Sequence, residues 1–157
     1  MKWFIILWLV FLPLASQQPR TASLTALQCM TANVYFEAQG ESELGMQAVA
    51  QVTMNRVKAK GFPSSVCTVV FQPRQFSWTH RRSYKDIQKA LNGATEHLAT
   101  KDRQAYHLAY KTAKKALSGA LLVPQLKESL YFHAKGANPY WNSRFKKRAT
   151  IGAHEFY

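Results

Sequence analysis

Two carboxylates, Glu37 and Glu41, stand at the end of an apolar run and have the clearest chemical potential in this sequence. The apolar residues before them recur at helical spacing: Leu24, Leu27, Met30, Val34 and Ala38. This pattern predicts a helix with Glu37 in its buried last turn, while Gly40 ends the helix and turns Glu41 away. Burial disfavours the charged form, so we expect the pKa of Glu37 to lie above the usual ~4.3, which suits a general acid. The alternative is an ordinary surface carboxylate at a helix end.

The other elements predict an α+β fold, a mostly helical single domain with a small antiparallel β-sheet. Ser42 is suited to capping a helix from about 43 to 58, which would pack behind the acid. A short helix is expected after 61–63, and the basic region 83–118 reads as helical, with one helix from about 101 to 117. Two short aromatic runs, 129–133 and 151–157, are typical of two strands.

Residues 72–80 have the composition of a cleft loop, because Pro73 interrupts a helix and aromatic residues alternate with polar ones. Sugars offer hydroxyl groups to polar side chains and a flat C–H face to aromatic rings. Gln75, Ser77 and Trp78 are therefore candidates for a saccharide-binding wall. A second loop carries Tyr140 and Trp141, two large aromatics that must either pack or bind something.

The charge is strongly basic, +13 over 157 residues, and it is unevenly spread. Residues 1–78 hold six Lys and Arg against three Asp and Glu, whereas residues 79–157 hold fifteen against five. This excess favours an anionic partner such as cell wall polymer or an anionic membrane surface. Nucleic acid is not expected, because residues 144–148 form only a short basic cluster and no nucleic-acid module is recognisable.

The first residues predict export. Lys2 precedes an apolar run of twelve residues, 3–14, which fits a secretory signal and is short for a membrane span. We interpret 1–23 as a signal peptide or signal anchor plus linker, and 24–157 as one catalytic domain. The expected location is the periplasm or cell envelope, with the chain free or anchored through an uncleaved N-terminal segment.

Several short motifs follow one another from about Leu27 to Tyr157: 35–41 (YFEAQGE), 48–57 (AVAQVTMNRV), 62–63 with 66–67 (FP, VC), 75–78 (QFSW), 131–133 (YFH), 138–141 (NPYW) and 151–157 (IGAHEFY). In this order they resemble the signature of SleB-type cell wall hydrolases. Gln39 departs from that signature, standing where the family commonly has Arg.

This resemblance implies a peptidoglycan-degrading enzyme that cleaves between N-acetylmuramic acid and N-acetylglucosamine, with Glu37 as the catalytic acid. It also implies a lysozyme-like cleft in which the sheet faces Glu37. A two-carboxylate hydrolase needs a partner ~5 to 9.5 Å away, and no carboxylate is convincingly aimed, so a lytic transglycosylase is favoured over a muramidase. A cationic wall-binding or membrane-active protein without catalysis is the remaining alternative. The candidate substrate-binding residues are Glu41, Gln75, Ser77, Trp78, Tyr131, His133, Tyr140 and Trp141.

Two cysteines, Cys29 and Cys67, are compatible with one disulfide in an exported chain, and the resemblance supports their pairing. The alternative is two buried free thiols. His133 and His154 could be imagined as zinc ligands with Glu155, but no ligand spacing supports a metal site. We expect no metal, no cofactor and a monomer.

Overall fold

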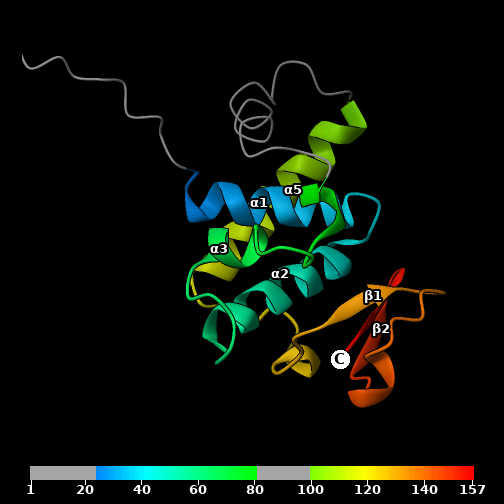
Figure 1. Ribbon diagram of the computed structural model, residues 1–157. Coiled ribbons are helices and arrows are strands. Elements are labelled where there is room, and N and C mark those ends of the chain that lie inside the picture. The colour runs from blue at the N-terminus through cyan, green and yellow to red at the C-terminus, as the bar shows by residue number, and fades with distance from the viewer. Residues whose placement is uncertain (1–23, 81–99) are drawn as a thin grey trace, which may run out of the picture.

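The computed structural model describes residues 24–80 and 100–157, in which four α-helices precede a small sheet (Figure 1). The expected signal segment, 1–23, and part of the basic helical region lie outside the described residues. None of the helices in the two described ranges is both long and apolar enough to cross a membrane.

The helices are α1 (Ala26–Ala38), α2 (Glu43–Lys58), the short α3 (Val66–Val70) and α5 (Thr100–Leu117). Thr25 caps α1 in a capping box with Gln28, and the predicted cap of α2 is confirmed, because Ser42 accepts a hydrogen bond from the Gly45 N–H. Helix α1 ends two residues before Gly40, as predicted. Helices α1, α2 and α5 pack against one another around a core that includes Met30, Val34, Met46, Val49, Ala109 and Ala113.

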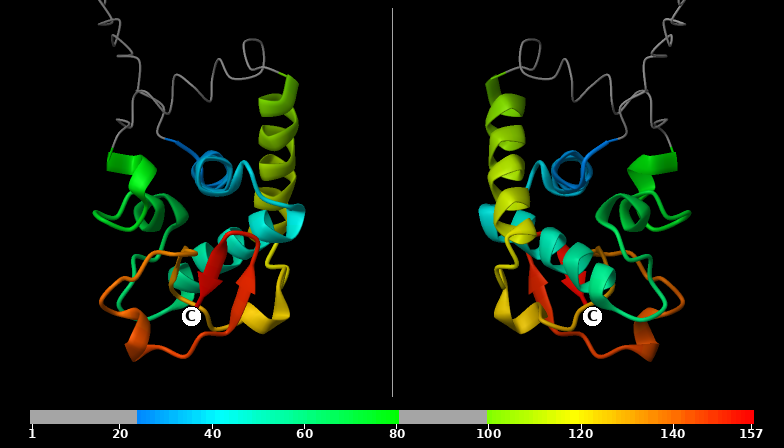
Figure 2. Two further views of the ribbon diagram at one scale, coloured as in Figure 1. Left: turned by 90° about the vertical axis from the view of Figure 1, so that its right-hand side faces the viewer. Right: turned by 90° about the vertical axis from the view of Figure 1, so that its left-hand side faces the viewer.

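The sheet has three antiparallel strands in the order β1-β3-β2: β1 (Phe132–Ala134), β2 (Ala149–Ile151) and β3 (His154–Phe156). The sequence predicted two strands, and the structure has three in this sheet. The run 151–157 was predicted as one strand, but Gly152 at φ 56° reverses the chain between β2 and β3. Strand β2 lies beside α2 (Figure 2). The two pack through a second core cluster, which contains Ala48, Val52, Val123, Leu126, Ile151 and Phe156.

A disulfide joins Cys29 in α1 to Cys67 in α3, with the two Cα atoms 5.2 Å apart. This confirms the predicted pairing. The single-turn helices are η1 (Ser77–His80), η2 (Pro124–Leu126) and η3 (Asn142–Arg144). The predicted α+β class, mostly helical with a small antiparallel sheet, is confirmed.

Candidate active site

Glu37 lies partly buried in the last turn of α1. Burial raises the pKa of its carboxyl from 4.5 to about 7, and the positive charge of Arg56 opposes this rise. The carboxyl therefore holds its proton close to neutral pH, which is the state that a general acid requires.

Arg56, in the last turn of α2, is 3% exposed and surrounded by aromatic rings. Its Nε donates to the Leu130 carbonyl at 2.7 Å, and its Cζ lies 5.2 to 5.9 Å from the ring centroids of Phe76, Phe62 and Tyr131. Burial lowers the pKa of Arg56 to about 10, so the guanidinium stays charged at neutral pH. Its buried Nη1 has no hydrogen-bond partner in the described part of the chain.

A buried polar clamp fixes α1 against α2 one turn before Glu37. Asn33 Nδ2 donates to the Thr53 hydroxyl at 3.1 Å, and Asn33 Oδ1 accepts from Trp78 Nε1 at 3.0 Å. Because all three side chains are buried and paired, the clamp orients the end of α1 and tolerates little displacement.

Trp78 consequently packs inside the protein. It is 7% exposed and its ring lies 4.9 Å from that of Phe36, the neighbour of Glu37. Its ring packs in the core, and its expected role in a saccharide wall stays a prediction. Gln75 is partly buried in a turn, where its N–H donates to the Gln72 carbonyl, and Ser77 is exposed at the start of η1.

Glu41 contacts the β2–β3 turn. Its two carboxylate oxygens accept from the Ala153 N–H at 3.1 and 3.2 Å, and Oε1 lies 3.7 Å from His154 Nδ1. The Glu41 side chain is 13% exposed. This carboxylate thus joins the α1–α2 loop to the sheet, and its expected contact with substrate stays a prediction.

An aromatic cluster brings together three residues that the sequence singled out: Tyr131, His133 and Trp141. The ring of Trp141 lies 5.4 Å from that of Tyr131 and 5.6 Å from that of His133. Tyr140 is 83% exposed beside them, with the Arg144 guanidinium 5.9 Å from its ring centroid. Since Tyr131 also lies beside Arg56, this cluster is linked through Arg56 to the acid.

Sequence reasoning missed two members of this cluster, Phe145 and Tyr157. Phe145 stacks on Tyr131 at 4.6 Å, and the Tyr157 hydroxyl lies 3.0 Å from His133 Nε2. Phe145 is 42% exposed. The signal available in the sequence was an aromatic residue that stands between cations, Arg144 and Lys146.

Further carboxylates are engaged away from Glu37. Glu155 accepts from Lys147 Nζ at 3.0 Å and from the Tyr157 hydroxyl at 3.3 Å, and the Lys147 hydrogen bond lowers the pKa of Glu155. Within residues 24–80 and 100–157, no three His, Cys, Asp or Glu side chains gather as metal ligands would. The site therefore offers one protonatable carboxyl, one buried cation and an aromatic surface.

These features define a helical α+β protein in which, among residues 24–80 and 100–157, Glu37 at a helix end is the glutamate with a raised pKa. Residues 40–157, well over half of the sequence, match the family model described as Cell Wall Hydrolase. The chain belongs to this cell wall hydrolase family. The match begins three residues after Glu37, so it does not itself assign the acid.

Relatives and solved structures agree with this family. The chain is 32% identical over 140 residues to a spore cortex-lytic enzyme of Bacillus cereus, covering 88% of this chain and 46% of the relative. It is 30% identical over 144 residues to a spore cortex-lytic enzyme of Halalkalibacterium halodurans, covering 90% of this chain and 37% of that relative. The chain thus spans less than half the length of these relatives.

Two domains of known structure share the fold. The catalytic domain of the Bacillus cereus SleB protein matches with a TM-score of 0.59 and 29% identity, covering 88% of this chain and 93% of that domain. The catalytic domain of the germination-specific lytic transglycosylase SleB from Bacillus anthracis matches with a TM-score of 0.58 and 29% identity, covering 88% of this chain and 98% of that domain. The similarity therefore covers nearly the whole of both domains.

Proposed function

We propose that this chain cleaves the glycan strands of peptidoglycan between N-acetylmuramic acid and N-acetylglucosamine, as a lytic transglycosylase with Glu37 as acid and base. The observation that carries this proposal is the pKa of about 7 that burial gives Glu37. The family and the neighbouring SleB domains supply the substrate class.

In the proposed reaction the Glu37 carboxyl donates its proton to the glycosidic oxygen, and the bond from that oxygen to C1 of the muramic acid breaks. The C6 hydroxyl of the same sugar then attacks C1 to form the 1,6-anhydro ring, and the Glu37 carboxylate takes the hydroxyl proton. This route needs one carboxyl only. It fits a site in which Glu41 and Glu155 are occupied by the β2–β3 turn and by Lys147.

Replacing Glu37 with Gln tests the acid. Glu37→Gln should abolish the loss of turbidity of purified peptidoglycan, because an amide cannot donate this proton, while binding to the polymer persists. General acid catalysis contributes roughly 100- to 10,000-fold, so the effect should be large. Glu43→Gln is the matched control, because Glu43 is exposed in the first turn of α2, where its Oε1 accepts from Gln47 Nε2 at 3.1 Å and lies 3.5 Å from Lys115 Nζ. Equal clearing by wild type and Glu37→Gln would refute a catalytic Glu37, whereas binding without clearing by the wild type would favour a binding protein.

The products separate the two enzyme classes. Chromatography of digested sacculi should show 1,6-anhydromuramic ends, whereas reducing muramic acid ends would identify a muramidase. We further propose that the chain acts as a monomer in the cell envelope after export. The disulfide supports this location, because such bonds persist in oxidising compartments.

A further inference from the structure

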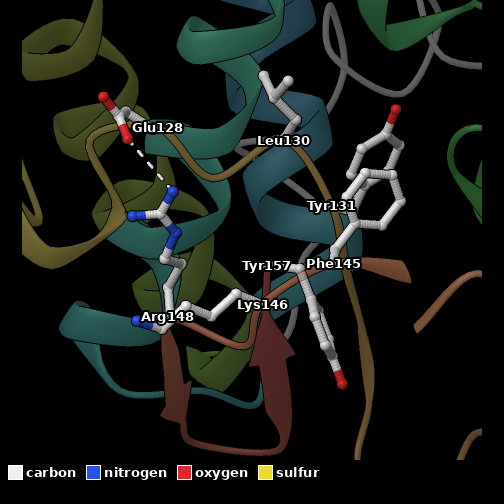
Figure 3. A pocket seen from close by; sticks show the side chains of 7 residues that line it. All are labelled: Glu128, Leu130, Tyr131, Phe145, Lys146, Arg148 and Tyr157. Carbon is white, nitrogen blue, oxygen red and sulfur yellow. Dashed lines mark hydrogen bonds and ion pairs between the residues drawn. The ribbon is translucent and has the colours of Figure 1, made fainter. Parts of the chain in front are cut away.

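A pocket of about 120 Å³ lies beside the aromatic cluster, between the segment that follows η2 and the segment that leads into β2 (Figure 3). Three aromatic rings, one aliphatic side chain and three charged groups form its walls. We call it the Tyr131 pocket, lined by Glu128, Leu130, Tyr131, Phe145, Lys146, Arg148 and Tyr157.

The charges in the Tyr131 pocket do not cancel. Arg148 Nη2 lies 3.2 Å from Glu128 Oε2, so this cation has a carboxylate partner at the pocket wall (Figure 3). Lys146 makes no ion pair with any residue of the ranges 24–80 and 100–157. The walls thus carry one positive charge in excess beside apolar surface, which suits a small anionic group on a hydrocarbon stem.

Tyr131 connects this pocket with the acid. Its ring forms part of the pocket wall, where it stacks on Phe145 at 4.6 Å, and its centroid lies 5.9 Å from the Arg56 guanidinium carbon. Arg56 in turn is close enough for its charge to act on Glu37. The pocket wall and Glu37 are thus both within reach of the Arg56 charge.

We propose that the Tyr131 pocket is a subsite for a carboxylate of the peptide stem that peptidoglycan carries on its muramic acid residues, with Lys146 as the principal contact. This inference rests on the proposed function, because it takes peptidoglycan as the substrate. Whole-ligand pockets commonly measure ~300 to 1,000 Å³, so a pocket of about 120 Å³ admits a short acidic side chain and excludes an N-acetyl sugar. The position beside Arg56 favours a substrate carboxylate over a lipid phosphate.

Kinetics on two matched substrates test the subsite. Soluble glycan strands with intact stems are compared with the same strands after an amidase has removed the stems. Wild type should show a KM roughly tenfold lower for stem-bearing strands, the size expected of one charge-assisted contact. Lys146→Ala should lose this difference and leave KM for stripped strands and both kcat values unchanged. Lys111→Ala removes the same charge from an exposed position on α5 and should change neither KM.

A binding measurement makes the test independent of turnover. Calorimetry of Glu37→Gln with a soluble stem-bearing fragment should give tighter binding than with the stripped fragment, and adding Lys146→Ala should remove that preference. A thermal melt confirms that each variant is folded. If no protein cleaves either strand but the preference persists, the proposed function fails and the subsite stands.

Three results would overturn the subsite. The first is equal affinity of wild type for stem-bearing and stripped strands, and the second is an equal loss with Lys146→Ala and Lys111→Ala. In the third, Lys146→Ala loses binding to vesicles rich in phosphatidylglycerol but keeps the preference for stem-bearing strands. This result would assign the pocket to lipid phosphate.

Discussion

At the scale of single residues, the burial of Glu37 has two opposed effects, one on its protonation and one on the stability of the fold. Burial keeps its proton near pH 7, and the same burial destabilises the folded protein whenever the group ionises. The folded pKa of about 7 lies above the ordinary 4.5, so the folded state binds more protons than the unfolded state between these values. Stability is therefore lost as pH rises through this window, and the loss is complete above pH 7.

Glu37→Gln should consequently stabilise the protein at alkaline pH. Each pKa unit corresponds to ~1.4 kcal/mol, so the shift sets a ceiling of about 3 kcal/mol, and partial exposure reduces the expected gain to about 1 to 2 kcal/mol at pH 8. At pH 4 the gain should vanish, because the carboxyl is protonated in both states. Thermal unfolding of both proteins across this range measures it, and a gain independent of pH would contradict the raised pKa.

If Glu37 is the acid, burial raises the upper pH limit of activity and Arg56 should lower it. Its charge lowers the pKa of Glu37, so Arg56→Met should shift the alkaline limb of the kcat/KM profile to higher pH, while Arg56→Lys should shift it less. The limb reports the pKa of the acid in the free enzyme, which separates this effect from a general loss of folded protein. An unmoved limb in a folded Arg56→Met variant would show that the two groups are not coupled.

The burial and raised pKa of Glu37 could be predicted from the sequence, because they follow from a local helical stripe and a terminating glycine. Trp78 and Glu41 could not be assigned in this way. Trp78 is paired with Asn33, 45 positions earlier, and Glu41 with Ala153, 112 positions later. A sequence motif names polar and aromatic candidates, but only the tertiary contacts decide whether each faces the cleft or the core.

At the scale of elements, the disulfide holds the start of α1 against α3, across 38 positions of sequence. Closing a loop of this size stabilises by roughly 3 to 4 kcal/mol in the chain-entropy model. Reduction, or the double change Cys29→Ser and Cys67→Ser, should lower the unfolding temperature by several degrees or more. Mass spectrometry of alkylated, unreduced protein should find no free thiol, and labelling of both cysteines would disprove the bridge in solution.

The β2–β3 turn is fitted closely to Glu41. A Cβ on Gly152 would overlap Glu41 Oε2, and φ of 56° already disfavours other residues there. Gly152→Ala should therefore cost about 2 to 4 kcal/mol, since it adds displacement of a hydrogen-bonded carboxylate to the backbone strain. Gly136→Ala is the control, because Gly136 has φ of 83° with open space around its Cβ position. Equal losses of unfolding free energy in urea would show that the Glu41 contact contributes nothing.

The helices were predictable to within a few residues because their caps and apolar stripes are local. Helix α2 begins after Ser42 and ends at Lys58, as the sequence indicated. The sheet was less predictable. Strands of three residues carry almost no periodicity, and the turn at Gly152 is determined by a partner far away in sequence.

At the scale of the whole molecule, the net charge of +13 is much larger than any one site requires. Several of the cations are exposed on α5, which contributes nothing to the Tyr131 pocket: Lys111, Lys114 and Lys115. A general field of this kind raises the concentration of enzyme on an anionic polymer without directing the chemistry at Glu37. Attraction to the polymer and the catalytic step should therefore respond differently to salt.

Raising ionic strength should weaken binding to intact sacculi steeply, because attraction between exposed charges fades over ~10 Å at 0.1 M salt and ~3 Å at 1 M. The kcat on short soluble glycans without stems should change less than about twofold, since the proposed acid, Glu37, is partly buried. Cosedimentation of Glu37→Gln with sacculi measures the first quantity, and product release from soluble strands measures the second. If salt lowered kcat on stripped strands as strongly as it lowered binding to sacculi, the excess charge would have to act within the catalytic step.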